Sequence, residues 1–161
     1  MKILVTGSNG LLGQKLTELL DSDKSVEFVA TAARPAVIPI VRGKFALLDI
    51  TDGAAVDQVI DEARPDVIIN TAAMTQVDHC ETQREACWKA NVTAVENLVK
   101  AAKRNYAHLI HVSTDFIFDG TEGPLVETAT PNPVNFYGKT KLAAEELLIK
   151  SNINWTILRT V

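Results

Sequence analysis

Short runs of mostly apolar residues alternate along the chain with segments in which apolar residues recur at helical spacing. The runs lie at Ile3–Val5, Val26–Thr31, Phe45–Leu48, Asp66–Ile69, His108–Val112 and Trp155–Leu158. Continuous apolar runs of this length are typical of strands that are buried on both faces of a parallel sheet. The pattern therefore predicts six parallel strands joined by crossovers.

Four of the segments between these runs are predicted helices, at Leu11–Leu20, Ala54–Ala63, Gln83–Asn105 and Phe136–Lys150. Thr51 or Asp52 is expected to cap the second helix. Residues 34–43 contain two prolines, so this crossover is predicted not to be a regular helix. Residues 119–135 form a long loop rich in Gly, Pro and Thr, and a loop of this length is usually functional.

This order of elements predicts an α/β domain of the Rossmann type, with a doubly wound parallel sheet of strand order 3-2-1-4-5-6. The 161 residues are enough for one domain, and no repeats or internal linkers interrupt them. Ligands of such sheets bind beyond the carboxyl ends of the strands, near the switch point between strands 1 and 4. The candidate site residues are therefore those that follow each strand.

Three glycines follow the first strand, spaced Gly-x-x-Gly-x-x-Gly between residues 7 and 13. Glycine is needed where a turn is tight and where the backbone must approach a pyrophosphate. The helix that begins there would direct its free N–H groups at the phosphates. The predicted pyrophosphate site comprises Gly7, Asn9, Gly10, Leu11, Leu12 and Gly13.

The second strand is followed by Ala32, Ala33 and Arg34, without the acidic residue that an NAD-specific fold places there. Small residues leave room for an adenosine 2′-phosphate, and Arg34 would pair with it. A solvated loop arginine is the alternative. NADPH is therefore the favoured cofactor, and NADH stays open.

The third and fourth strands are followed by short segments that also suit a nucleotide. Asp49 and Ile50 are placed to meet the adenine edge, although a capping role for Asp49 is an equal alternative. The small residues Thr71, Ala72 and Ala73 would let the cofactor lie close to the backbone.

The fifth strand is followed by Ser113 and Thr114, and the next helix opens with Tyr137 and Lys141. Residues four apart share a helix face, so Tyr137 and Lys141 are expected to be neighbours. A nearby ammonium favours the phenolate, and it is expected to lower the pKa of Tyr137 by up to about three units before desolvation opposes it. The spacing predicts a pair for proton transfer.

Composition narrows the function class. A formal net charge of −4 argues against a nucleic-acid partner. Cys80 and Cys87 form no Cys-x-x-Cys pair and are expected to be reduced thiols. His79, His108 and His111 lack metal-ligand spacing, so no metal site is predicted. No apolar run is long enough for a signal sequence or a membrane span, which predicts a cytoplasmic protein.

The glycine turn, Ser113-Thr114-Asp115 and Tyr137-x-x-x-Lys141 together resemble the extended short-chain dehydrogenase/reductase family. The resemblance is greatest to its dTDP-4-dehydrorhamnose reductase branch and covers essentially the whole chain. The segments that carry it are residues 70–73 with Val77, Asp78 and Glu81, and then residues 90–92, 113–120 and 132–143.

The resemblance implies a role for each candidate. Thr114, helped by Ser113, would polarise the substrate carbonyl. Tyr137 would donate the proton, and Lys141 would both tune Tyr137 and hold the nicotinamide ribose. Asn91 would support an active-site water or the backbone. A departure is Met74, which stands where relatives commonly carry a tyrosine beside the cofactor.

The implied activity is NADPH-dependent reduction of a 4-keto group on a nucleotide-linked deoxysugar. The alternative is a non-catalytic NADP-binding subunit similar to the regulatory beta subunit of methionine adenosyltransferase. Family members continue well beyond the sixth strand, so residues 1–161 are expected to be an NAD(P)-binding domain truncated at its C-terminal end, with the substrate domain absent. The expected partner is a nucleotide-sugar substrate, no membrane is expected, and a homodimer stays open.

Overall fold

The computed structural model describes residues 1–161 and contains one sheet of six strands flanked by helices. The strands are β1 (Lys2–Thr6), β2 (Glu27–Ala32), β3 (Lys44–Leu47), β4 (Val67–Asn70), β5 (His108–Thr114) and β6 (Trp155–Thr160). Every pairing is parallel, and the order across the sheet is β3-β2-β1-β4-β5-β6. The predicted Rossmann-type sheet is confirmed.

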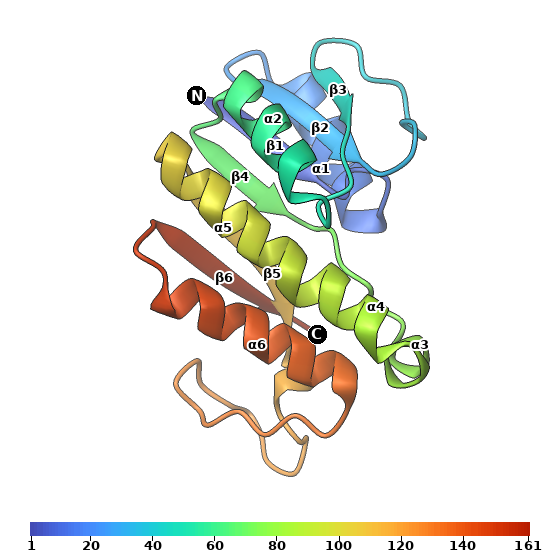
Figure 1. Cartoon of the computed structure of the whole chain (residues 1–161), viewed down its shortest axis with the longest axis vertical. Coiled ribbons are helices and arrows are strands. Elements are labelled where there is room, and N and C mark those ends of the chain that lie inside the picture. Colours follow the sequence, from blue (N-terminus) through green and yellow to red (C-terminus); the bar gives the residue numbers. More distant parts are fainter.

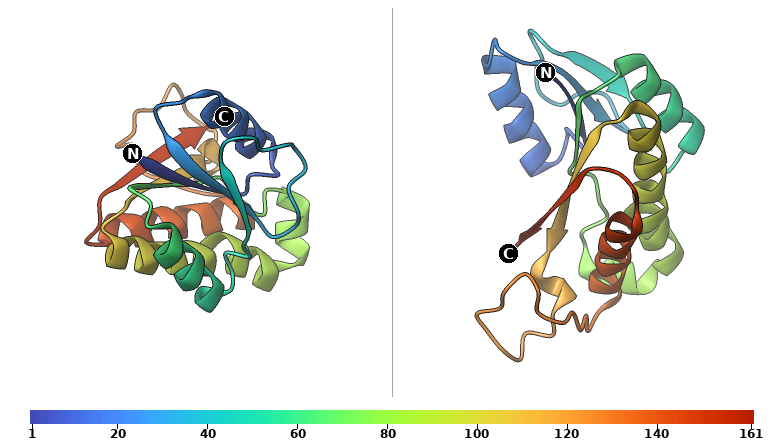
Figure 2. Two further views of the ribbon diagram at one scale, coloured as in Figure 1. Left: turned by 90° about the horizontal axis from the view of Figure 1, so that it is seen from above. Right: turned by 90° about the vertical axis from the view of Figure 1, so that its left-hand side faces the viewer.

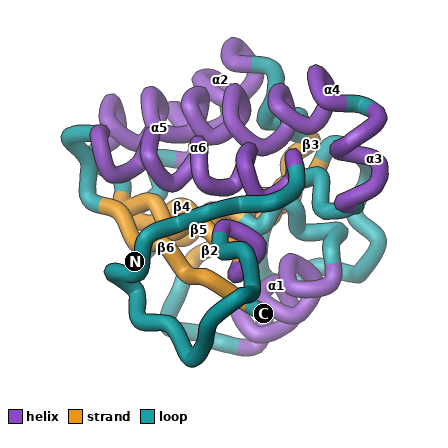
Figure 3. Tube along the Cα trace, turned by 90° about the horizontal axis from the view of Figure 1, so that it is seen from below, coloured by secondary structure: helices purple, strands orange, loops and turns teal.

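The helices are distributed unevenly over the two faces of this sheet. They are α1 (Leu11–Ser22), α2 (Gly53–Ala63), α3 (Val77–Thr82), α4 (Arg84–Trp88), α5 (Ala94–Asn105) and α6 (Phe136–Lys150), with a π-helical turn η1 (Lys89–Thr93) and a 3₁₀ turn η2 (Asp115–Ile117). Figure 1 shows α2, α5 and α6 in front of the strands, and the side view in Figure 2 places α1 on the other face. Figure 3 shows the same two layers from below. No helix combines the length and the apolar character needed to span a membrane.

Apolar clusters on both faces of the sheet explain the continuous apolar runs. Ile3 and Val5 of β1 pack on the α1 side with Phe28, in a cluster that Leu20 of α1 covers. Leu4, between them in sequence, belongs to the larger cluster of 17 buried residues under α2, α5 and α6. Because successive strand residues point to opposite faces and both faces are covered, Ile3, Leu4 and Val5 are all buried.

Two local expectations are confirmed. Residues 33–43, between β2 and β3, contain no helix. Asp52 is the N-cap of α2, and its carboxylate accepts hydrogen bonds from the backbone N–H groups of Ala54 and Ala55.

The helix expected over residues 83–105 is divided. α4 ends at Trp88, η1 makes one π turn, and α5 begins at Ala94. A single wider turn leaves the apolar periodicity on either side nearly intact, so the pattern does not reveal it. The preceding helix α3 has six residues, which is too short to show a period, and the sequence did not predict it.

Candidate cofactor and catalytic site

Glycine shapes the turn after β1. Gly7 has a φ of +70°, in the left-handed region, and a Cβ on it would lie 2.7 Å from the backbone nitrogen of Ala72. A Cβ on Gly13 would overlap the carbonyl oxygen of Gly7. The turn, the start of α1 and the segment after β4 therefore approach one another so closely that side chains are excluded at both glycines.

The start of α1 leaves polar groups without partners. Gly10 is the N-cap and supplies no side-chain acceptor. The backbone N–H groups of Leu11, Leu12 and Gly13 precede the first intrahelical acceptors, and both leucine side chains are exposed. The hydroxyl of Ser8 is the one buried side-chain polar atom without a hydrogen-bond partner. Free donors at the positive end of a helix suit phosphate oxygens.

Asn9 ties this turn to the crossover that follows β2. Its Nδ2 donates to the carbonyls of Arg34 and Pro35 at 3.2 and 2.9 Å, and its Oδ1 accepts from the N–H of Val37 at 3.2 Å. The amide is thus engaged with the loop. The Arg34 side chain is exposed and takes part in none of the ion pairs.

A cavity of about 300 Å³ opens where β1, β2, β3 and β4 end. The predicted cofactor-binding residues that line it are Gly7, Asn9, Gly10, Arg34, Asp49, Ile50, Thr71, Ala72 and Ala73. The predicted residues that do not line it are Leu11, Leu12, Gly13, Tyr137 and Lys141. Four loops that are far apart in the sequence therefore form one concave surface at the switch point of the sheet.

Asp49 has a local partner of its own. Its carboxylate accepts from the N–H of Thr51 at 2.9 Å, while the cap of α2 is Asp52. Asp49 therefore stabilises the turn before the helix, and it stays exposed on the wall of the cavity.

Tyr137 lies in the first turn of α6, close to the end of β5. It is buried, and its ring meets that of Phe116 edge-on with 5.9 Å between the centroids. Asn135 caps α6 by accepting from the N–H of Gly138 at 2.7 Å, and a Cβ on Gly138 would overlap the carbonyl oxygen of Phe116. The cap and the glycine together let the start of α6 approach η2.

Burial raises the pKa of the Tyr137 phenol above its ordinary value. A hydrogen bond with the Thr114 hydroxyl opposes that rise, and the negative charge of Asp115 adds to it. The expectation that Lys141 lowers the pKa of Tyr137 is therefore wrong for this structure. Desolvation of a buried phenolate dominates, because the Lys141 ammonium is held elsewhere.

Lys141 is 2% exposed and is bound to β5 rather than to Tyr137. Its Nζ donates to the carbonyl of Val112 at 2.7 Å and lies 3.2 Å from Nε2 of His111. Burial lowers the pKa of Lys141 to about 8, and the carboxylate of Glu145 opposes that shift.

Glu145 is a residue of the site that sequence reasoning missed. It is fully buried on α6, accepts a hydrogen bond from the Ser113 hydroxyl at 2.5 Å, and pairs with Arg159 of β6 at 2.8 Å. Ser113 therefore faces α6. The spacing of Lys141 and Glu145, four residues apart on one helix, was the available signal.

Asn91 joins the segment after β4 to α6. Its Oδ1 accepts from the N–H of Met74 at 2.8 Å, and its Nδ2 donates to the Met74 carbonyl and to the Thr140 hydroxyl, both at 3.0 Å. The π turn η1 carries this buried amide. Asn91 was expected to support either an active-site water or the backbone, and the structure shows it bound to the backbone of Met74.

The two cysteines are joined, so the expectation of reduced thiols is wrong here. Cys80 of α3 and Cys87 of α4 form a disulfide with Cα atoms 5.2 Å apart. The break between the two helices at Gln83 lets residues seven apart meet, and the sequence pattern did not show this break. The pair packs in one cluster with Tyr137.

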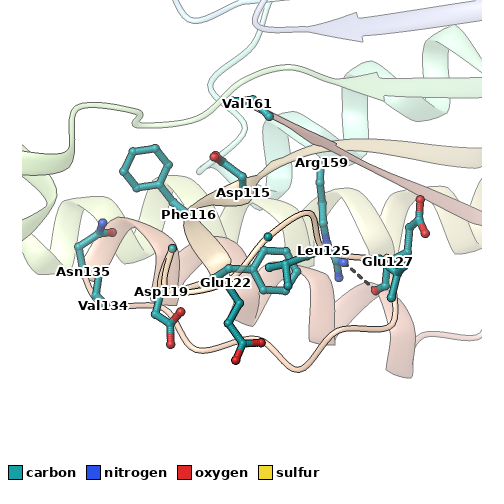
Figure 4. Close-up of a pocket in the computed structure, with 14 residues that line it drawn as sticks. Asp115, Phe116, Asp119, Glu122, Leu125, Glu127, Val134, Asn135, Arg159 and Val161 are labelled. Carbon is teal, nitrogen blue, oxygen red and sulfur yellow. Dashed lines mark hydrogen bonds between the residues drawn. The ribbon is translucent and has the colours of Figure 1, made fainter.

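A second cavity, of about 580 Å³, lies under the loop between β5 and α6. Asp115 and Phe116 line it on one side, and Arg159 and Val161 of the chain end line it on another (Figure 4). Arg159 also donates to the Glu127 carbonyl at 2.8 Å, the dashed contact in Figure 4. Asp115, which lines this cavity, directly follows Thr114 in the sequence.

Comparison with known proteins agrees with this geometry. The family described as the RmlD substrate binding domain matches residues 1–161. The chain belongs to this family. The resemblance predicted from the sequence motifs, to the dTDP-4-dehydrorhamnose reductase branch of the extended short-chain dehydrogenases/reductases, is thereby confirmed.

Relatives of this RmlD-family chain carry two different names. A dTDP-4-dehydrorhamnose reductase of Aggregatibacter actinomycetemcomitans is 38% identical over 160 residues, which are 99% of this chain and 50% of that protein. A methionine adenosyltransferase 2 subunit beta of Xenopus tropicalis is 38% identical over 158 residues, 98% of this chain and 46% of that protein.

A solved structure extends the comparison. The dTDP-4-dehydrorhamnose reductase of Bacillus anthracis, in complex with NADP, has a TM-score of 0.87 and 31% identity over 98% of this chain and 52% of that chain. The RmlD-family chain thus spans about half the length of the relatives that it matches.

Proposed function

We propose that this chain is the cofactor-binding part of an NADPH-dependent reductase that acts on a 4-keto group of a nucleotide-linked deoxysugar. The observation that carries the proposal is the cavity at the switch point, lined by the glycine turn and by the ends of four strands. Thr114, Tyr137 and Lys141 follow at the same edge of the sheet. The reductase names of relatives and the NADP bound in one of them support this proposal.

The residues present fit a phosphorylated dinucleotide. The close backbone approach at Gly7 and Gly13, the free N–H groups of α1 and the unpartnered hydroxyl of Ser8 suit a pyrophosphate. Small residues after β2 and the exposed Arg34 suit an adenosine 2′-phosphate. When bound, the nicotinamide would supply the hydride.

The proton that the carbonyl oxygen of the ketone takes up would come from a side chain of this protein. Tyr137, whose pKa is raised by burial, is a protonated phenol at neutral pH and is able to donate to a carbonyl oxygen. The adjacent Thr114 hydroxyl would hold that oxygen. The second cavity begins at Asp115, so it would receive the part of the substrate that lies beyond the ketone.

A regulatory subunit is the second candidate, because a relative of equal identity is a subunit beta of methionine adenosyltransferase. Oxidation of NADPH by the full-length protein with a dTDP-4-keto-deoxysugar supports the reductase. Binding of NADPH and of a methionine adenosyltransferase catalytic subunit, without turnover, supports the regulatory role. The cytoplasmic location and the homodimer stay predictions.

The cofactor proposal is testable on the 161-residue chain. Titration of this chain with NADPH, followed by fluorescence, is expected to show saturable binding, because the groups that fit the pyrophosphate lie within residues 1–161. Gly13→Ala is expected to abolish binding, since its Cβ overlaps the Gly7 carbonyl. Gly123→Ala is the control, because no atom lies within 4 Å of that Cβ. Lack of binding by the unaltered chain would contradict the proposal.

A further inference from the structure

The loop of residues 118–135, between η2 and α6, forms most of the wall of the second cavity. Every residue from 121 to 128 is exposed, and the apolar side chains of Leu125 and Val126 are 42% and 63% exposed. Burial of its own apolar side chains therefore contributes little to holding this loop. Its position depends on polar contacts with the rest of the chain.

Hydrogen bonds close the two ends of the loop and leave its middle with a single link. At the ends, Nδ2 of Asn132 donates to the carboxylate of Asp119 at 2.7 Å. Between them, residues 120–131 make one hydrogen bond to the chain outside the loop, from Nη1 of Arg159 to the carbonyl of Glu127 at 2.8 Å (Figure 4). One side chain of β6 therefore holds the middle of the loop.

The guanidinium of Arg159 is itself held in one orientation by Glu145. Its Nε lies 3.2 and 3.3 Å from the two carboxylate oxygens, and its Nη2 donates to one of them at 2.8 Å. Glu145 is fully buried and also accepts from the Ser113 hydroxyl. Because a guanidinium is planar and rigid, a carboxylate that occupies Nε and Nη2 also fixes the direction of Nη1.

Phe118 gives Arg159 a second contact with the loop. The guanidinium carbon lies 5.5 Å from the centroid of the Phe118 ring, which is the geometry of a cation–π contact. Phe118 stands at the start of the loop and Glu127 near its middle, so one side chain joins two separate points of the loop to β6. Both residues line the cavity, as Arg159 does.

The charges around the cavity distinguish two roles for Arg159. It is the one basic residue among those that line the cavity, together with four acidic ones. A free cation at this place would suit an anionic group of a ligand. However, the charge of Arg159 is paired with Glu145, and each of its three side-chain nitrogens has an acceptor within the chain. The contacts favour a hold on the loop over the binding of an anion.

We propose that Arg159 is a positioning residue: directed by Glu145, it holds the loop of residues 118–135 in place as the wall of the second cavity. The consequence for the substrate rests on the proposed function, in which this cavity receives the part of the substrate beyond the ketone. Ser113 shares Glu145 with Arg159 and directly precedes Thr114 in β5. The loop is thereby tied to the strand that carries Thr114, and releasing it should weaken substrate binding.

The first test is limited proteolysis of the chain without cofactor or substrate. A glutamate-specific endopeptidase can cut the exposed loop after Glu122 and Glu127, and mass spectrometry identifies the fragments. Arg159→Lys keeps a cation for Glu145 but lacks the nitrogen that reaches the Glu127 carbonyl. Proteolysis follows the population of the opened loop, so the loss of one charged hydrogen bond should speed this cleavage about tenfold or more.

The matched control is Arg104→Lys, which makes the same change in a pair between α5 and Asp57 of α2 and should leave loop cleavage unchanged. Cleavage of folded Arg159→Lys at the rate of the unaltered chain would refute the proposal. If that variant does not fold, Phe118→Leu decides, because it removes the ring and keeps the pair with Glu145. Its loop should be cut about two- to fivefold faster, and an unchanged rate would refute the proposal equally.

The second test uses the full-length protein and separates KM from kcat. In Arg159→Lys the KM for a dTDP-4-keto-deoxysugar is expected to rise about tenfold, with kcat and NADPH affinity changed less than about twofold. A raised KM with unchanged loop cleavage would mean that Arg159 binds the substrate itself, and would overturn the positioning role. Because the proteolysis needs no substrate, failure of the loop anchor and failure of the proposed function are seen separately.

Discussion

The two halves of the candidate site are built in opposite ways. At the ends of β1 to β4 the site is made of small residues and bare backbone, and the cavity wall is partly exposed. At β5 and α6 the site is made of large polar side chains, and Lys141 and Glu145 are at most 2% exposed. In the first half, glycine and other small residues leave space for a ligand. In the second half, buried polar side chains are paired with one another.

This contrast separates binding from chemistry. A glycine surface approaches a ligand closely and needs no charge of its own, because helix N–H groups supply the polarity. Buried charges instead require complete sets of partners, because an unpaired ion is strongly destabilising in the interior. Changes in the first half should therefore alter affinity, and changes in the second should alter turnover or stability.

The largest effect is expected from Tyr137→Phe in the full-length protein. The ring and its contact with Phe116 stay, but the proton donor is lost, so kcat should fall by about 10²–10⁴-fold with little change in NADPH affinity. Steady-state oxidation of NADPH measures it. Tyr106→Phe, at a position 93% exposed, is the control. Near-normal turnover would mean that the proton has another source.

A stability effect of similar size is expected from Glu145→Ala. The change leaves Arg159 and Ser113 without their shared partner, and breaking a buried ion pair costs about 3–5 kcal/mol of unfolding free energy. Urea denaturation measures this loss.

Glu146→Ala is the matched control for that measurement, since the neighbouring residue makes an exposed pair with Lys150 worth less than about 0.5 kcal/mol. Equal losses of unfolding free energy in the two variants would show that the buried pair stabilises the fold no more than the exposed pair does.

The smallest effect is expected in the first half, from Arg34→Ala. If the guanidinium binds the 2′-phosphate, the preference for NADPH over NADH should narrow by about 1–3 kcal/mol. Titration with both cofactors gives the difference. Arg84→Ala, whose side chain lies outside the cavity and pairs with Glu81, should change neither affinity. Equal affinities in the unaltered chain would remove the role proposed for Arg34.

The sequence by itself determined the architecture and the glycine half of the site. Continuous apolar runs, helical periods and the spacing of Gly7, Gly10 and Gly13 are local signals. Ligands bind where parallel strands end, and this rule locates the cofactor site from those signals. For this reason most of the residues predicted to bind cofactor line one cavity.

Only the tertiary structure decided the partners of the buried polar groups. Lys141 meets His111, 30 residues away, and His111 meets Asn70, 41 residues away, whereas helical spacing alone assigned Lys141 to Tyr137. The direction of a pKa shift and the pairing of Ser113 with Glu145 depend on such contacts, because desolvation and hydrogen bonding act over a few ångströms in space, whatever the separation along the chain.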